Sequence, residues 1–463
     1  MGVFEKKKSV WMLLSVGLVA GLLAGCAGGG GGGNAENGGD ASNAAGSNSE
    51  ASDAPAGTDE KVTIKFSGWG EPNEKKLYED LIKNFESQNP NIKVQYIHIP
   101  ADYAGKMNTV LAGGNAPDVF YAGDGDVARW IKLGVIKNIQ QQVDESGFDM
   151  SDMYESAVDR YRYDGMKMGT GDLYALPMDV AGTVLYYNKK LFDEAGVPYP
   201  SAETPMTFDE LVEVGKKLTK DSNGDGKPDQ YGMGPAWWEG FVWGNGGKIL
   251  SDDRTQFVLN EDKAVEALQF AADMRNVHKI SPDARALQAM NDGQMFETGK
   301  LAMMIGGRWS VPVFRNLKFD WDVAPIPANG AWSGWSASTG YSVYAKTKYP
   351  DQAFKFAAYL AGEEANRIRS EQGLTMPVYK SMANSDVFLT PGTKPENAQV
   401  FLKAVETEQA GPWTYVPNNK WWDIINQNLG QMWEGKTTAK DLMEKIKPDV
   451  EKALREGNPE LFQ

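Results

Sequence analysis

The sequence contains very little cysteine and histidine. Of its 463 residues, one is cysteine, Cys26, and two are histidine, His98 and His278. The chain therefore has too few of these residues for the usual zinc sites or for a catalytic triad that depends on histidine. The sequence also has no H-E-x-x-H motif, nucleophile elbow, P-loop or paired C-x-x-C motif. These absences argue against the common metalloenzyme and hydrolase classes.

Basic residues are also fewer than acidic residues. The chain has 47 Lys and Arg against 62 Asp and Glu, a formal net charge of -15. Such a chain is repelled by phosphate backbones, so we expect no nucleic-acid partner. Hydrophobic residues make up 41% of the sequence and charged residues 24%, which is ordinary for a soluble globular protein. A chain of this length is too long for one compact core, so we expect two lobes. We also expect the protein to be a monomer.

The N-terminal hydrophobic run is too short and too rich in glycine for a transmembrane helix. It covers Val10–Leu23, follows Lys6–Lys8, and indicates a signal peptide over residues 1–25. The run ends in Leu23-Ala24-Gly25-Cys26, which resembles the bacterial lipobox, where the cysteine is lipidated and becomes the mature N-terminus. We expect Cys26 to anchor the protein to the outer face of the cell membrane. The alternative is an ordinary secretory signal with a chance cysteine.

Residues 26–60 have the composition of a flexible tether. Six consecutive glycines, Gly28–Gly33, are followed by Asn, Ala, Ser, Gly and acidic residues. No hydrophobic residue in this stretch can nucleate a core. A long tether suits a domain that is anchored in a membrane and faces the medium.

From Lys61 the sequence alternates between strand and helix patterns. Val62–Phe66 alternates apolar and polar residues, and Tyr78, Leu81, Ile82 and Phe85 have the spacing of an amphipathic helix. A strand over Ile92–Ile99, a helix over Tyr103–Leu111 and a strand over Asp118–Ala122 complete a predicted βαβαβ unit. The fold class is therefore α/β.

Further helices are indicated by their start signals. Thr207 and Glu210 form a capping box, and Pro350 begins a helix with apolar residues on one face. Two more helices are predicted near the C-terminus, over Trp421–Trp433 and Ala439–Leu454.

Several short sequence blocks stand out from about Val62 onward. They are Ala116-Pro117-Asp118-Val119-Phe120, Tyr174-Ala175-Leu176-Pro177, Leu185-Tyr186-Tyr187-Asn188-Lys189, Gly306-Gly307-Arg308-Trp309, Trp321-Asp322-Val323-Ala324-Pro325-Ile326-Pro327 and Tyr341-Ser342-Val343-Tyr344. In this order they resemble the extracellular solute-binding proteins of the maltose-binding family, which serve sugar ABC importers. Each block is a weak signal, but their order and spacing together are specific.

The resemblance implies a two-lobed α/β fold of the periplasmic-binding-protein type, with hinge strands and a ligand cleft between the lobes. On this basis the first lobe takes residues 61–178 plus 338–368, and the second takes 184–337 plus 369–463. The hinges fall near Asp179–Thr183 and Ala337–Gly340, where small residues can absorb a change in φ and ψ. The implied protein is a receptor without catalytic residues or cofactor, which binds a sugar or oligosaccharide and delivers it to an ABC transporter permease.

Tryptophan is abundant, with 14 residues, and many of them fall in predicted loops. An indole packs on the C–H face of a sugar, while acids and amides bond to its hydroxyls. Trp130 and Trp321 are assigned to the core because of their helix and strand patterns. The predicted ligand-binding residues are Trp69, Glu71, Asn73, Asp124, Asp126, Asp179, Trp237, Trp238, Glu239, Arg308, Trp309, Trp335, Trp413 and Trp422.

One loop has the spacing of an EF-hand. Oxygen-bearing side chains occupy positions 1, 3, 5 and 9, and glycine occupies position 6, but position 12 is Gly232 and not the expected glutamate. The candidate metal-binding residues are Asp221, Asn223, Asp225, Lys227 and Asp229. The loop is either a weak structural calcium site or a surface turn rich in Asp and Asn.

Two alternative functions remain open on sequence grounds, and a third is rejected. A secreted glycan-active enzyme also needs an aromatic cleft with paired carboxylates, although no pair of acids is singled out here. The same fold could instead bind a peptide or a polyamine, because aromatic rings attract cations. The pattern Gly123-x-Gly125-x-x-Ala128 matches a relaxed dinucleotide fingerprint, but Asp124 and Asp126 would repel a pyrophosphate, so we reject it.

Overall fold

The computed structural model describes residues 61–330 and 332–463, which belong to one compact unit. The predicted signal peptide over 1–25, the predicted anchor Cys26 and the predicted tether over 26–60 lie outside the described residues.

The first sheet has five strands and mixed direction. Its order is β2-β1-β3-β12-β6. The strands are β1 (Val62–Gly68), β2 (Ile92–His98), β3 (Val119–Gly123), β6 (Ala175–Pro177) and β12 (Thr339–Val343). β1 pairs in parallel with β2 and β3, whereas β12 returns from far along the chain and pairs antiparallel with β3 and β6. The predicted βαβαβ unit is therefore confirmed.

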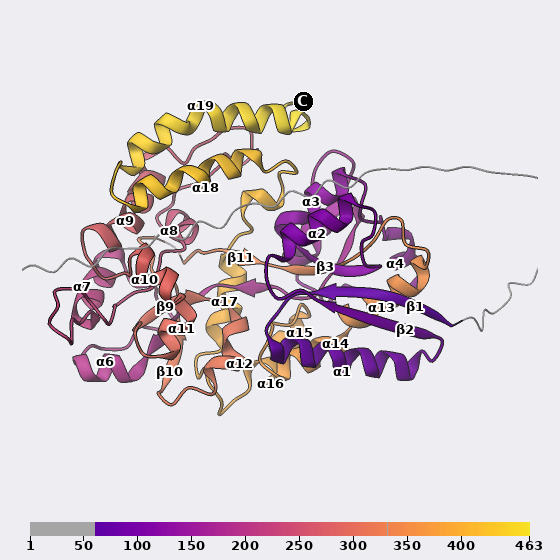
Figure 1. Cartoon of the computed structure of the whole chain (residues 1–463), viewed down its shortest axis with the longest axis horizontal. Helices are drawn as coiled ribbons and strands as arrows, with labels where there is room; N and C mark the ends of the chain where they lie inside the picture. Colours follow the sequence, from indigo (N-terminus) through magenta and orange to yellow (C-terminus); the bar gives the residue numbers. More distant parts are fainter. Residues whose placement is uncertain (1–60, 331) are drawn as a thin grey trace, which may run out of the picture. The chain divides into compact units, whose positions relative to one another are not determined.

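Helix α1 (Pro72–Gln88) runs beside strands β1 and β2 (Figure 1). Pro72 opens the helix, where a missing N–H costs nothing. The predicted apolar face, Tyr78, Leu81, Ile82 and Phe85, is buried. The other helices near this sheet are α2 (Tyr103–Ala112), α3 (Asp124–Lys132), α4 (Gln140–Ser146), α5 (Glu155–Val158), α13 (Pro350–Ala361) and α14 (Glu363–Glu371), with a small hairpin of β4 (Arg162–Tyr163) and β5 (Asp172–Leu173).

The second sheet has three antiparallel strands in the order β10-β8-β9. They are β8 (Val184–Asn188), β9 (Met303–Gly306) and β10 (Trp321–Ala324). Every residue of β8 is buried. Because side chains alternate along a strand, Val184 and Tyr186 enter one hydrophobic core, while Leu185 and Tyr187 enter the other. The central strand of this sheet therefore separates two cores.

Most of the remaining helices surround this second sheet or follow it. The capping box at Thr207 is present and opens α7, as predicted. The two C-terminal helices are also present, and they lie side by side (Figure 1). These helices are α6 (Lys189–Ala195), α7 (Phe208–Leu218), α8 (Trp238–Gly244), α9 (Asp262–Asn276), α10 (Ala284–Ala289), α11 (Asp292–Glu297), α12 (Val311–Phe314), α15 (Lys380–Ala383), α16 (Asp386–Leu389), α17 (Gln399–Thr407), α18 (Lys420–Trp433) and α19 (Ala439–Gly457).

A short two-stranded ribbon lies at the predicted hinge segments. Strand β7 (Ala181–Gly182) pairs antiparallel with β11 (Ser336–Ala337). Gly182 is required here because a Cβ would come within 2.6 Å of the Ala404 side chain on α17. The predicted lobe boundaries remain predictions, since the described residues form one compact unit.

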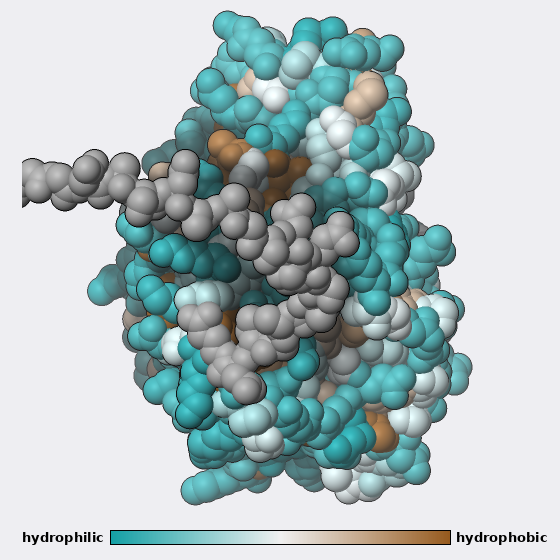
Figure 2. Space-filling view, turned by 90° about the vertical axis from the view of Figure 1, so that its right-hand side faces the viewer, coloured by the Kyte–Doolittle hydropathy of each residue, from teal (hydrophilic) through white to brown (hydrophobic). Residues whose placement is uncertain are grey.

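The face of the protein drawn in Figure 2 is largely hydrophilic, with a few small hydrophobic patches. Among residues 61–330 and 332–463, no helix has the length and apolar character needed to cross a membrane.

Candidate ligand-binding site

A cavity of about 360 Å³, which we call the tryptophan cavity, lies beside the ribbon. Its walls come from the end of β1, from segments next to the second sheet and from both strands of the ribbon. Six predicted ligand-binding residues line it, namely Trp69, Asp179, Trp237, Arg308, Trp309 and Trp335. Residues distant in the sequence are therefore gathered at one place by the crossing of the chain.

Three indole rings form one wall of the tryptophan cavity. The rings of Trp237 and Trp309 are nearly parallel, with an interplanar angle of 16° and centroids 6.3 Å apart. Trp335 lies 5.6 Å from Trp237 at an angle of 52°. Trp309 is 43% exposed although it is a large apolar residue. Such a surface offers a flat apolar face to a ligand.

The position of Trp309 depends on the glycine two residues before it. A Cβ at Gly307 would lie 2.0 Å from the Trp309 ring, so the ring packs directly on the backbone. The 3-10 turn over Arg308–Ser310 then presents the ring to the cavity.

Trp69 is fixed from the other side by aromatic contacts. Its ring meets Tyr103 at 4.9 Å and Tyr121 at 4.8 Å, both edge to face. Tyr103 in turn donates to the Ser67 carbonyl oxygen at 3.0 Å. The ring is therefore held in place before any ligand arrives, which lowers the entropy cost of binding.

Two carboxyl groups line the tryptophan cavity. Burial raises the pKa of Asp179 to about 6 and the pKa of Glu74 to about 8. Asp179 accepts a hydrogen bond from the Thr339 backbone N–H at 2.8 Å, and Tyr121 donates to Glu74 at 3.3 Å. At neutral pH the Glu74 carboxyl is therefore mostly protonated and can donate a hydrogen bond to a ligand oxygen.

Glu74 was not among the sequence predictions. Glu71 and Asn73 were predicted as hydrogen-bonding residues, but both are exposed at the start of α1 and neither lines the cavity. The one feature of the sequence that bears on Glu74 is the glycine four residues before it, Gly70. In the structure Gly70 has a φ of 121°, which is unfavourable for other residues. A Cβ there would lie 2.0 Å from the Glu74 carboxylate, so the Glu74 side chain folds back over this glycine.

A neighbouring cavity of about 640 Å³, which we call the Trp413 cavity, contains three more predicted residues. They are Asp126, Trp413 and Trp422. The rings of Trp413 and Trp422 are 4.3 Å apart, and Trp413 is 6.3 Å from Trp335. Five tryptophans therefore form a row of neighbouring rings that begins in the tryptophan cavity and ends in the Trp413 cavity. In order they are Trp309, Trp237, Trp335, Trp413 and Trp422.

Three other predicted residues line neither of these cavities. Asp124 is buried, and its carboxylate pairs with Arg160 at 2.5 Å. Trp238 is buried behind Trp422, with ring centroids 5.6 Å apart. Glu239 lies on α8, where burial raises its pKa to about 7.

Arg308 lines the tryptophan cavity and packs against two aromatic rings of the protein. Its guanidinium lies over the rings of Phe388 at 4.6 Å and Phe401 at 5.5 Å. It donates to the Phe388 carbonyl oxygen at 3.2 Å, and burial lowers its pKa to about 10. These contacts fit a residue that attaches the turn before Trp309 to helices α16 and α17.

The oxygens of the EF-hand-like loop are used within the loop. Asp221 accepts from the N–H groups of Gly224 and Gly226, and Asp229 accepts from Ser222. Asn223 and Asp225 likewise accept from N–H groups two residues on, the latter from Lys227. In the described part of the chain, no three His, Cys, Asp or Glu side chains are grouped to hold a metal ion. The loop is built as a series of Asx turns.

A two-lobed α/β fold with an aromatic cavity at its crossing strands defines a class of ligand receptor. Residues 55–367 match the family of bacterial extracellular solute-binding proteins, and the chain belongs to this family.

The individual relatives share little sequence identity with this chain, but the alignments extend over most of each relative's length. A galactooligosaccharide-binding protein of Bacillus subtilis is 24% identical, over 81% of this chain and 86% of its own. The maltodextrin-binding protein of the same organism is 27% identical, over 67% of this chain and 71% of its own. An ABC substrate-binding protein from Listeria monocytogenes in complex with cycloalternan superposes with a TM-score of 0.77 and 26% identity, over 85% of this chain and 99% of that chain. The expected two-lobed fold is thus confirmed.

Proposed function

We propose that this protein is the extracellular receptor of an ABC importer for a sugar or short oligosaccharide, and that Cys26 holds it at the membrane. The observation that carries the proposal is the row of five tryptophans that runs between the two cavities. Rigid aromatic faces with few polar groups suit the C–H faces and hydroxyls of a carbohydrate. The named ligands of the relatives support the same class.

The row of rings favours an oligosaccharide over a single sugar. Trp309 and Trp422 stand at its two ends, and the intervening rings are in contact along the way. A ligand with several sugar units could use successive rings, since each unit presents its own apolar face.

A glycan-active enzyme is the second candidate. The observation in its favour is that Glu74 and Asp179 both line the tryptophan cavity with raised pKa values, as an acid catalyst would require. We propose binding without turnover, because the family consists of binding proteins.

A calorimetric screen of the purified protein against malto-, galacto-, arabino- and chito-oligosaccharides, with peptides and polyamines as rival ligands, tests the proposal. Saturable binding of a carbohydrate and its recovery uncleaved support it. Binding of peptides or polyamines alone would replace the sugar by another ligand. Cleaved product that disappears in Glu74→Gln or Asp179→Asn would establish the enzyme.

A further inference from the structure

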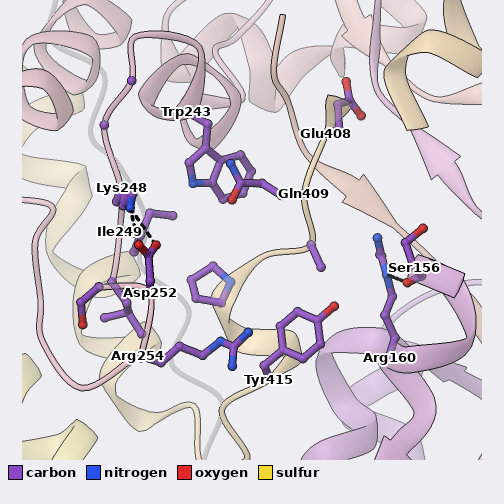
Figure 3. A pocket seen from close by; sticks show the side chains of 16 residues that line it. Ser156, Arg160, Trp243, Lys248, Ile249, Asp252, Arg254, Glu408, Gln409 and Tyr415 are labelled. Atoms are coloured by element: carbon purple, nitrogen blue, oxygen red, sulfur yellow. Dashed lines mark hydrogen bonds and ion pairs between the residues drawn. The ribbon is translucent and has the colours of Figure 1, made fainter. Parts of the chain in front are cut away.

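A third cavity, of about 530 Å³, is drawn with its lining residues in Figure 3. We call it the Arg254 cavity. Along β11, Trp335 and Ala337 line the tryptophan cavity, whereas Ser336 between them accepts hydrogen bonds from Arg160, which lines the Arg254 cavity. Because side chains alternate along a strand, the two cavities are separated by the ribbon. A ligand in one does not obstruct the other.

The walls of the Arg254 cavity come from three separate parts of the chain. Residues 156–160 form one side, residues 243–254 face them, and residues 408–415 lie between. The volume falls within the range of about 300 to 1,000 Å³ that is common for small-molecule sites. The cavity is therefore large enough for a ligand of one or two rings.

Arg254 is the one cation of this cavity that has no acceptor among the described residues. Its guanidinium lies 4.4 Å from the centre of the Tyr415 ring, and the two side chains point toward each other in Figure 3. The acids beside it are already engaged. Asp252 pairs with Lys248 at 2.7 Å, and Asp253 accepts from Ser251 at 2.6 Å and from the Thr255 hydroxyl at 2.9 Å.

The other charged groups of the cavity do not neutralise Arg254. Arg160 is paired with Asp124. Glu408 is half-buried and accepts hydrogen bonds from Thr183, and burial raises its pKa well above the ordinary value. In a chain of net charge -15, this cavity therefore presents a guanidinium that no carboxylate of the described residues pairs with.

The backbone of Arg254 is held in an unfavourable conformation. Its φ is 60°, in the left-handed region that non-glycine residues seldom adopt. Backbone strain of this kind recurs at ligand sites. The turn that imposes it places the guanidinium against Tyr415 and within the cavity.

We propose that the Arg254 cavity is a second binding site, which takes a small molecule bearing a carboxylate or phosphate group. The planar fork of Arg254 bonds to the oxyanion, and Tyr415 keeps the fork in place by stacking. Trp243 and Gln409, which also line the cavity, contact the body of the ligand. This site is independent of the sugar proposed for the tryptophan cavity.

Calorimetry on the purified full chain tests the site with glucose 6-phosphate and galacturonate as probes. Glucose is the neutral control, and chloride keeps the ionic strength constant, because screening alone changes charge–charge attraction. We expect at least one anionic probe to bind, with Arg254→Gln weakening it by at least about tenfold, since a charge-assisted bidentate contact is lost. The two anions distinguish a phosphate ligand from a carboxylate.

Two further variants guard against indirect effects. Arg285→Gln removes an exposed arginine elsewhere and should leave anion binding unchanged. Ala410→Phe fills the cavity without touching the charge of Arg254, and it should abolish anion binding while the melting temperature and the binding of sugar are retained. Equal anion binding by the parent protein and Arg254→Gln would overturn the proposal. The absence of binding by both anions up to about 10 mM would overturn it as well.

Discussion

Removing the Trp309 ring should weaken ligand binding strongly and affect folding little. A tryptophan side chain has about 250 Å² of surface to bury, and the 43% of Trp309 that is exposed leaves about 110 Å² for the ligand. At about 25 cal/mol per Å², this area corresponds to about 2.7 kcal/mol, or roughly a hundredfold in Kd. Trp309→Ala should therefore raise the Kd for the best oligosaccharide by about two orders of magnitude.

Trp321→Ala is the matched control. Trp321 is 1% exposed, and its indole N–H donates to the Phe314 carbonyl oxygen at 2.7 Å. Truncation leaves a cavity and an unsatisfied carbonyl, which should cost about 3 to 5 kcal/mol of stability. Isothermal calorimetry and urea unfolding of both variants separate the two effects. The reasoning is refuted if Trp309→Ala binds as well as the parent, or if it loses as much stability as Trp321→Ala.

Four further predictions follow from the sequence and the site. Cys26→Ala should release the protein from the membrane or leave it unprocessed, and continued incorporation of labelled fatty acid would contradict the anchor. If the loop Asp221–Asp229 binds calcium, excess calcium should raise the melting temperature relative to chelator by mass action; equal melting temperatures would leave it a surface turn. The raised pKa of Glu74 favours the folded state below about pH 4.5, and this contribution is lost as the pH rises through about 8. As the pH rises from 5 to 9, the free energy of unfolding of the parent should therefore fall by about 2 to 5 kcal/mol more than that of Glu74→Gln. Parallel pH profiles of the two proteins would disprove this. Ligand should also bring the lobes together, so that small-angle scattering curves with and without saturating sugar differ; identical curves would indicate a rigid receptor.

Local patterns predicted several helices and strands well. The apolar spacing of Tyr78 to Phe85 marks α1, and Thr207 with Glu210 marks the start of α7, because these signals depend on neighbours within one or two turns. Pairing of β12 between β3 and β6 carries no such local signal. The family resemblance predicted only that residues 338–368 return to the first lobe, and it did not predict which strands β12 pairs with.

Individual site residues were harder to predict, because burial of a side chain depends on distant segments. Trp421 and Trp422 are adjacent on α18, yet Trp421 is fully buried and Trp422 lines the Trp413 cavity. Asp124 looked like a free acid after a strand, but Arg160 approaches from 36 positions further along the chain and pairs with it. Glu74 was missed because its orientation depends on the backbone of Gly70.

The sequence by itself determined the net negative charge, the lipobox-like motif, the alternation of strands and helices, and the number of tryptophans. These properties are local or additive along the chain. The tertiary structure alone decided which tryptophans share a wall, which carboxyls are protonated at neutral pH, and that Arg254 faces a cavity without an acceptor among the described residues. The physical reason is that stacking, desolvation and charge pairing act over a few ångströms in space, between residues that lie hundreds of positions apart in the chain.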